Sequence, residues 1–226
     1  MAEFINHNAT MESPNETGST SSVNALNGTA LPVMEAFYTL QGEGSFTGKP
    51  AWFIRLGGCD VGCVWCDVKA SWNAADHPLQ SVSEIVKTAV ESPCRMAVIT
   101  GGEPCMYQLS PLVDALHEAG FTVNLETSGA YPLSGTIDWI CVSPKKFKAP
   151  LPEVLAVANE LKVVIFNKSD FEWALLQAEQ TKGSCRLFLQ PEYEKSAQMI
   201  PSIIEFLKSH PNWSLSLQTH KFIGIP

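Results

Sequence analysis

The order of apolar and helix-like segments is the feature of this sequence that most limits its fold. Short apolar runs that read as strands alternate with segments of helical period between residues 33 and 226. Strands that alternate with helices pair in parallel through βαβ units, so the pattern predicts an α/β fold. About six or seven mostly parallel strands fit an open, incomplete (β/α) barrel. The predicted strands span residues 51–56, 96–99, 122–126, 139–142, 161–166, 186–189 and 213–217, and the predicted helices span 82–91 (with Ser83 as its cap), 109–119, 153–159, 170–179 and 196–209.

Polar residues follow most of these predicted strands. They occupy positions 100–103, 126–129, 143–145, 167–168, 190–192 and 218–221. The carboxyl ends of parallel strands form one face of such a fold, and binding sites are built there. The polar clusters are therefore expected to converge on one rim and to form a site.

The first 32 residues have a different composition from the rest. They are rich in Asn, Ser and Thr and show no apolar period. Residues 1–32 are therefore predicted to be a disordered, low-complexity tail, and residues 33–226 a single domain. The formal net charge of −8 gives no electrostatic reason to bind nucleic acid or an anionic membrane. With no apolar run long enough to cross a bilayer and no secretory signal pattern, a cytoplasmic location is expected.

Three of the seven cysteines lie close together, directly after a predicted strand. Cys59, Cys63 and Cys66 have Cys-x3-Cys-x2-Cys spacing, which can ligate three irons of a [4Fe-4S] cluster and leave the fourth iron open. A zinc site is the alternative, but structural zinc usually takes four ligands in paired sets. A buried or redox-labile group of cysteines is a further alternative. The other four, Cys94, Cys105, Cys141 and Cys185, read as small buried hydrophobic residues.

Two motifs carry a resemblance to a known superfamily. The cysteine spacing, with the aromatic Trp65 before the last cysteine, resembles the signature of radical S-adenosylmethionine (SAM) enzymes. Thr100-Gly101-Gly102-Glu103-Pro104 resembles the glycine-rich motif of the same superfamily, which contacts the SAM amino group. The resemblance implies an incomplete barrel of the radical SAM type. It also implies that SAM binds the open iron and is cleaved to a 5′-deoxyadenosyl radical.

A narrower resemblance covers the chain from about residue 34 to its end. Residues 37–44, 53–56, 142–145 and 218–221 resemble segments of the 7-carboxy-7-deazaguanine synthases (QueE). This family converts 6-carboxy-5,6,7,8-tetrahydropterin to 7-carboxy-7-deazaguanine and ammonia, on the route to queuosine and other 7-deazapurines. SAM is regenerated, so it acts as a cofactor. Because ammonia is lost without net redox change, the resemblance implies a lyase. It also implies a flavodoxin or ferredoxin as reductant, and a homodimer.

The resemblance also assigns binding roles to residues. The catalytic chemistry is left to the cluster and SAM, and no side chain is assigned a catalytic role. The SAM pocket is implied at Trp65, Cys66, Asp67, Gly102, Ser143, Pro144 and Lys145, and the pterin site at Leu40, Gln41, Gly42, Glu43, Arg55, Thr100, Gln190 and Pro226. Arg55 would pair with the substrate carboxylate through two parallel hydrogen bonds. Four of these residues, and also His220, have an ordinary alternative. It is a turn for Gln41 and Glu43, a structural ion pair for Arg55, solvated surface for Lys145, and a core position for His220.

One residue departs from the family pattern. Family members usually carry Asp-Thr or Asp-Ser after the last cysteine, and that hydroxyl helps to hold Mg²⁺. This chain has Asp67-Val68, and valine offers no oxygen to a hard cation. Reduced dependence on Mg²⁺ is therefore expected. The main competing function is a radical SAM activase that makes a glycyl radical on a partner protein, but the Gln41-Gly42-Glu43 segment with Arg55 suits a small acidic heterocycle better.

Overall fold

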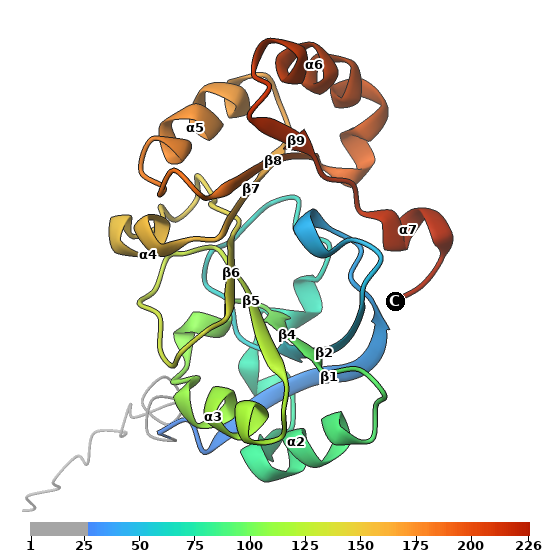
Figure 1. Cartoon of the computed structure of the whole chain (residues 1–226), viewed down its shortest axis with the longest axis vertical. Helices are drawn as coiled ribbons and strands as arrows, with labels where there is room; N and C mark the ends of the chain where they lie inside the picture. The colour runs from blue at the N-terminus through green and yellow to red at the C-terminus, as the bar shows by residue number, and fades with distance from the viewer. Residues whose placement is uncertain (1–26) are drawn as a thin grey trace, which may run out of the picture.

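The computed structural model describes residues 27–226, so residues 1–26 of the tail predicted for residues 1–32 lie outside the described part. A single nine-stranded sheet organises the fold, with strand order β3-β1-β2-β4-β5-β6-β7-β8-β9 (Figure 1). The strands are β1 (Ala30–Leu40), β2 (Pro50–Leu56), β3 (Leu79–Ser81), β4 (Met96–Gly101), β5 (Thr122–Thr127), β6 (Trp139–Val142), β7 (Glu160–Ile165), β8 (Arg186–Pro191) and β9 (Trp213–Leu215). The α-helices are α2 (Val82–Val90), α3 (Ser110–Glu118), α4 (Pro152–Val157), α5 (Ser169–Ala178), α6 (Ser196–Ser209) and α7 (Thr219–Ile223).

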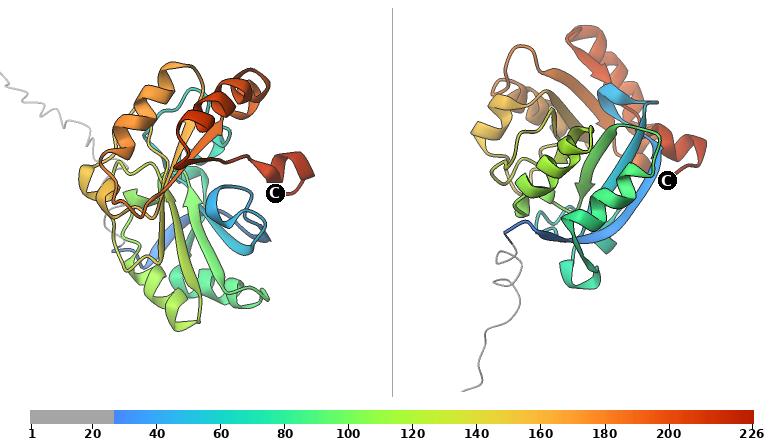
Figure 2. Two further views of the ribbon diagram at one scale, coloured as in Figure 1. Left: turned by 45° about the horizontal axis from the view of Figure 1, so that its top comes forward. Right: turned by 60° about the horizontal axis from the view of Figure 1, so that its bottom comes forward.

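The sheet is parallel from β2 through β4 to β9, and antiparallel where β1 pairs with its two neighbours. β1 pairs antiparallel with both β2 and β3. β3 and β9 end the strand order without pairing with each other, so the barrel is incomplete, as the sequence predicted. Helices α2 to α6 follow the outside of the curved sheet, whereas α7 lies at its open side (Figures 1 and 2).

Two apolar clusters fill the space between the sheet and these helices. One joins β1, β2, β4 and β5 to α2 and α3, and includes Leu56, Ile99 and Leu125. The other joins β6 to β9 to α4, α5 and α6, and includes Leu161 and Ile165. Helices cover one face of the parallel sheet, so polar side chains gather at the carboxyl ends of its strands.

The start of the fold corrects the predicted domain boundary. The tail was expected to reach residue 32, but β1 begins at Ala30, and Leu31 is only 1% exposed. Ala30 to Pro32 also pair with the short strand β3, which the sequence pattern did not indicate. The change in composition at residue 33 therefore lies three residues after the first strand begins.

Most predicted elements lie within a few residues of their observed positions, and the helix at 196–209 has the predicted bounds. The predicted cap of α2 was wrong. Ser81 is the N-cap, and it forms a capping box with Glu84, rather than Ser83. None of the helices described in residues 27–226 is long and apolar enough to cross a membrane.

Candidate active site

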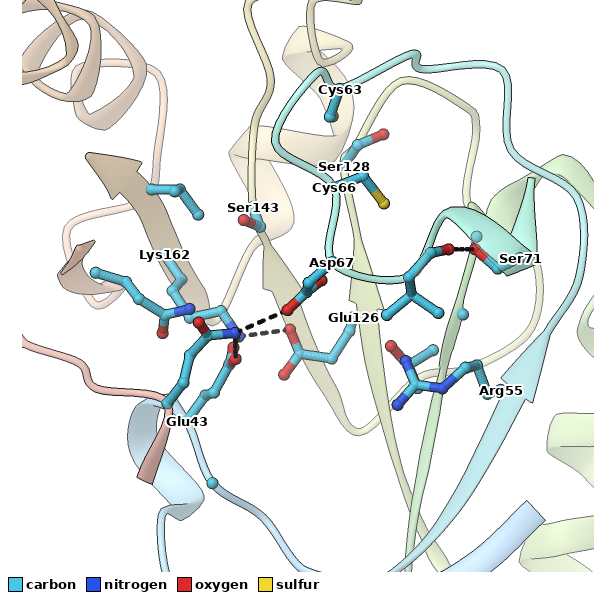
Figure 3. A pocket seen from close by; sticks show the side chains of 18 of the residues that line it. Glu43, Arg55, Cys63, Cys66, Asp67, Ser71, Glu126, Ser128, Ser143 and Lys162 are labelled. Atoms are coloured by element: carbon cyan, nitrogen blue, oxygen red, sulfur yellow. Dashed lines mark hydrogen bonds and ion pairs between the residues drawn. The ribbon is translucent and has the colours of Figure 1, made fainter. Parts of the chain in front are cut away.

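A cavity of about 570 Å³ opens at the carboxyl ends of the parallel strands (Figure 3). It is bounded by the carboxyl ends of β4, β5, β6 and β8 and by three other segments. These are the segment after β1 (residues 41–43), the cysteine loop after β2 (residues 58–68) and the C-terminal segment (residues 218–226). Polar clusters from five of the six strand ends contribute to its wall, as the sequence predicted. The exception is 167–168 after β7, which lines a separate hollow, while Lys162 and Val164 within β7 face the main cavity instead.

The cysteine loop is held by backbone contacts at its base. Gly58 N donates to Ser71 O at 2.6 Å, and Cys59 N donates to Trp72 O at 3.0 Å. Gly58 has φ +98°, a conformation that side chains other than glycine rarely adopt. A Cβ on Gly102 would lie 2.1 Å from Gly58 O and 2.9 Å from Cys59 Cβ. The glycine-rich end of β4 therefore packs directly against the start of the cysteine loop.

Cys59, Cys63 and Cys66 all face this cavity. Burial raises the pKa of Cys63 to about 11, with a smaller raising effect from its neighbours Cys66 and Cys59 and an opposing one from Lys145. Burial likewise raises the pKa of Cys59. Thiols that raise one another's pKa gain from a bound cation, which holds all of them as thiolates.

The donor set fits an iron–sulfur cluster better than a single metal ion. Among residues 27–226, no three His, Cys, Asp or Glu side chains are grouped so that they could hold one metal ion. The three cysteines instead line a cavity of about 570 Å³, and their loop closely approaches Gly102. Three cysteines suit a cubane cluster that leaves one iron free for a small ligand.

Buried Glu103 fixes the glycine-rich edge of the cavity. Its side chain accepts hydrogen bonds from Thr127 Oγ1 at 2.6 Å, Ser128 N at 2.8 Å and Cys105 N at 3.0 Å. The Ser128 hydroxyl also donates to it. Because Glu103 is only 1% exposed, these bonds satisfy a carboxylate that water does not reach. They join the ends of β4 and β5 and so hold Gly102 in place.

A buried ion-pair network lies across the cavity from the cysteines. Lys162 Nζ lies 2.6 Å from Glu43 Oε2 and 2.8 Å from Glu126 Oε2 (Figure 3). Gln218 donates to Glu43 at 2.9 Å, and Gln41 donates to Glu126 at 3.4 Å. The Lys162 side chain is 4% exposed, so both carboxylates depend on this one ammonium for charge compensation.

The two carboxylates differ in their electrostatic state. Burial acts to raise the pKa of Glu43, but Lys162 and the Gln218 hydrogen bond outweigh it and lower that pKa to about 2. For Glu126 burial prevails over Lys162, and the pKa is raised. Burial opposes the charged form of Lys162, yet surrounding anionic groups raise its pKa well above the usual value. The network therefore keeps Glu43 ionised and presents hydrogen-bond acceptors to the cavity.

Basic side chains face the cavity from β2 and from the loop after β6. Arg55 points toward the cavity and pairs through Nε with Glu35 Oε1 at 2.6 Å (Figure 3). Lys145 Nζ donates to Ser143 Oγ at 2.6 Å and lies 5.7 Å from the Trp65 ring centroid. Lys145 is thus part of the wall rather than solvated surface. Arg55 shows both of its predicted features, a structural ion pair and a place in the cavity wall.

The C-terminal segment folds back against the segment after β1. Thr219 N donates to Gly42 O at 2.9 Å, and Thr39 Oγ1 donates to Pro226 O at 3.4 Å. Lys221 Nζ lies 2.5 Å from Asp67 Oδ2 beside the cysteine loop. A Cβ on Gly42 would meet His220 Nδ1 at 2.1 Å, so only glycine allows this approach. His220 lines the cavity and is not a core histidine, and burial lowers its pKa.

The structure brings the predicted site residues together with one exception. All of those named in the sequence analysis line the cavity except Pro144, which is buried beside it. Sequence reasoning missed Lys162 and gave Glu126 no specific role. The signal was present, because Lys162 is the only charged residue within the apolar run 161–166. A buried lysine is rare without carboxylate partners, so that position pointed to an acidic pair.

The fold and this site define a radical SAM enzyme, an incomplete parallel barrel with a three-cysteine loop beside a glycine-rich strand end. The Radical SAM superfamily matches residues 53–145. A 7-carboxy-7-deazaguanine synthase of Flavobacterium psychrophilum is 50% identical over 88% of this chain and 94% of its own length. The corresponding Escherichia coli protein is 39% identical over 86% of this chain and 98% of its own length. The crystal structure of QueE from Escherichia coli matches with a TM-score of 0.76 and 33% identity, covering 89% of this chain and 99% of that one. The chain therefore belongs to the 7-carboxy-7-deazaguanine synthase family.

Proposed function

We propose that this protein converts 6-carboxy-5,6,7,8-tetrahydropterin to 7-carboxy-7-deazaguanine with release of ammonia. The relatives that match along nearly the whole chain carry the synthase name, which favours this reaction over activation of a glycyl-radical protein. One observation carries the proposal. The three cysteines share a single cavity with Arg55 and the paired carboxylates Glu43 and Glu126, so a cofactor and a small polar heterocycle can bind in contact with each other.

The residues of the cysteine end would hold the cofactors. Cys59, Cys63 and Cys66 would ligate a [4Fe-4S] cluster. SAM would lie among Trp65, Asp67, Gly102, Ser143 and Lys145, with Pro144 behind them. When bound, the cluster and SAM supply the one-electron chemistry that removes a hydrogen atom from the substrate. The protein's contribution is to place the substrate and to exclude water around it.

The opposite end of the cavity would hold the pterin. Arg55 would bind the substrate carboxylate through its guanidinium, beside Thr100 of β4. Glu43 and Glu126 would accept hydrogen bonds from the N–H groups of the ring, and Lys162 keeps Glu43 ionised for that purpose. Leu40, Gln41, Gly42 and Gln190 would complete the wall, and Pro226 would close it from the C-terminal side.

We also propose partners and setting for this reaction. A flavodoxin or ferredoxin would supply the electron, the protein would act as a cytoplasmic homodimer, and the product would serve the synthesis of queuosine, a modified nucleoside of tRNA. The resemblance to the family supports these proposals.

Magnesium has a weaker place in the proposed site. Val68 lines the cavity where the family pattern has a hydroxyl, and its own carbonyl accepts from Ser71 N and Ser71 Oγ at 3.0 and 2.7 Å. Asp67, the neighbouring carboxylate, pairs with Lys221. We therefore expect turnover to persist after chelation of Mg²⁺, and a Val68→Thr variant to bind Mg²⁺ more tightly in calorimetry. Loss of turnover on chelation, with binding as tight as in the variant, would contradict this.

An anaerobic turnover assay tests the main proposal. The reconstituted protein would receive SAM, dithionite and 6-carboxy-tetrahydropterin, and product would be followed by mass and absorbance. We expect 7-carboxy-7-deazaguanine to form without stoichiometric consumption of SAM. Cleavage of SAM without a deazaguanine product would show that the substrate is wrong, although the radical SAM assignment would stand.

A further inference from the structure

The connection between β1 and β2, residues 41–49, carries part of the candidate site and is called the β1–β2 loop below. Its first three residues, 41–43, line the cavity, and the short 3-10 helix η1 (Gly44–Phe46) follows them. The loop is closed at its base, because Gln41 N donates to Lys49 O at 2.8 Å. The place of residues 41–43 in the cavity therefore depends on what holds η1.

Glu160, the first residue of β7, holds this short helix and is only 2% exposed. Its Oε2 accepts hydrogen bonds from Ser45 N at 3.1 Å and from Trp139 Nε1 at 3.2 Å. Cys141 Sγ donates to its Oε1 at 3.5 Å. That oxygen lies so close to Gly44 that a Cβ on this glycine would overlap it. All three donors are neutral, so the buried carboxylate is satisfied by hydrogen bonds that join the β1–β2 loop to β6 and β7.

A second set of contacts joins the same loop to the C-terminal half of the sheet. The Phe46 ring packs edge-on against that of Trp139, with the ring centroids 5.0 Å apart. Gly44 N donates to Ser216 Oγ at 2.9 Å, and that hydroxyl donates to Gln190 Oε1 at 2.7 Å. Since β1 and β2 lie in the other half of the strand order, the β1–β2 loop bridges the two halves of the open barrel.

Strand β7 holds the β1–β2 loop at two points. Glu160 and Lys162 are two residues apart, so their side chains leave the strand on the same face. Lys162 Nζ pairs with Glu43 Oε2 at 2.6 Å, and Glu160 Oε2 accepts from Ser45 N at 3.1 Å. The position of Glu43 in the cavity wall is thereby set by a strand of the sheet rather than by the loop alone.

We infer that Glu160 is a positioning residue for binding of the pterin, although it does not itself line the cavity. It acts through the hydrogen bond from Ser45 N, which seats η1 and so places residues 41–43. The inference rests on the proposed function, in which those residues form the wall around the pterin. A displacement of about 1 Å in such a wall is enough to impair a site strongly. The charge of Glu160 is a second route of influence, because Lys162 lies on the same face of β7, and the experiment has to separate the two.

Two conservative substitutions separate the hydrogen bond from the charge. Glu160→Asp keeps the charge but withdraws the carboxylate from Ser45 N by one methylene, about 1.5 Å. Glu160→Gln loses the charge, but its amide oxygen can still accept from Ser45 N and Trp139 Nε1. Anaerobic calorimetry on the reconstituted, SAM-loaded protein should show an affinity for 6-carboxy-tetrahydropterin that is about tenfold weaker in Glu160→Asp and within about twofold of the wild type in Glu160→Gln. The affinity for SAM should be unchanged in both, because the β1–β2 loop contributes no residue to the proposed SAM pocket.

Hydrogen exchange of the backbone amides supplies a readout that needs no substrate. Amides of residues 41–49 should exchange faster in Glu160→Asp than in the wild type or Glu160→Gln, whereas those of α3 should not change. Glu153→Asp and Glu153→Gln, at an exposed position of α4, are the matched controls and should alter neither exchange nor pterin affinity.

Two results would overturn the inference. One is any order of pterin affinities other than a selective loss in Glu160→Asp. The other is faster exchange throughout Glu160→Asp, which would show that Glu160 serves the fold alone. Absence of pterin binding by the wild type would instead overturn the proposed function and with it the inference, so the wild type alone tells the two failures apart.

Discussion

At the scale of single residues, Lys162 is the cation that pairs with two carboxylates of the site. It is buried within β7 and compensates Glu43 and Glu126, which come from separate parts of the chain. Lys162→Met would leave two carboxylates in a buried site without a cation. Removing one partner of a buried pair typically costs about 3–5 kcal/mol in the free energy of unfolding. Denaturant unfolding would measure it, with Lys208→Met as a surface control expected to cost at most about 1 kcal/mol.

The same network predicts an acid-sensitive contribution to stability from Glu43. Its pKa is lowered from 4.5 to about 2 in the folded protein, so its contribution is fully present above about pH 4.5 and is lost as the pH falls toward 2. The pKa of Glu126 is raised, so ionisation of this side chain lowers the stability of the folded protein. That loss sets in only as the pH rises above the pKa of Glu126 in the unfolded chain. Below about pH 4.5, the free energy of unfolding should therefore fall less steeply in Glu43→Gln than in the wild type, by up to about 1.4 kcal/mol per pH unit. Parallel curves would contradict the assignment.

At the scale of elements, the N-terminus of α2 distinguishes two serines that the sequence pattern confused. Ser81 Oγ accepts from Glu84 N at 3.3 Å, and Ser81 N donates to Glu84 Oε2 at 2.8 Å. Ser81→Ala should lower the free energy of unfolding by about 0.5–2 kcal/mol, because it removes a capping box. Ser83→Ala, two residues further on, should change it by much less. Equal effects in thermal unfolding of the two variants would show that the cap contributes little.

The elements also show what a sequence pattern can and cannot reveal. The parallel strands and the long helix α6 were predictable because their apolar periods are local and strong. Strand β1 was missed. Its residues Ala30 to Pro32 follow a polar tail, contain a proline and pair with β3, whereas the rest of the strand pairs antiparallel with β2. Likewise, α7 is a short helix with no buried residue, so it leaves no apolar period in the sequence.

The parts of the site that could be predicted are those whose residues are contiguous in the sequence. The cysteine loop and the glycine-rich strand end are local patterns, and their juxtaposition follows from adjacent parallel strands β2 and β4. The Lys162 network was not predictable in the same way. It joins Glu43, Glu126 and Lys162, which lie far apart in sequence, and only the folded sheet brings them together. The hydrogen bonds of Gln218 to Glu43 and Asp67 depend on long-range closure in the same way.

At the scale of the whole molecule, the C-terminal segment meets the segment after β1 and the cysteine loop at the mouth of the cavity. Thr219 N donates to Gly42 O in the segment after β1, and Lys221 pairs with Asp67 of the cysteine loop. Neither contact belongs to the sheet, and α7 buries no residue. Closure of the cavity is therefore separable from the stability of the barrel.

Removal of residues 219–226 should consequently affect ligand binding far more than folding. The truncated protein keeps the nine-stranded sheet and both apolar clusters, so its thermal unfolding should stay close to that of the full chain. Its cavity loses His220, Lys221 and Pro226, and calorimetry on the reconstituted protein should show at least about a tenfold weaker affinity for the pterin, equivalent to roughly 1.4 kcal/mol. Ile223→Ser is the control, because Ile223 is 61% exposed in α7 and does not line the cavity. Wild-type pterin affinity in the truncated protein would show that the C-terminal segment does not form part of the binding site, and a large loss of thermal stability would show that it belongs to the fold.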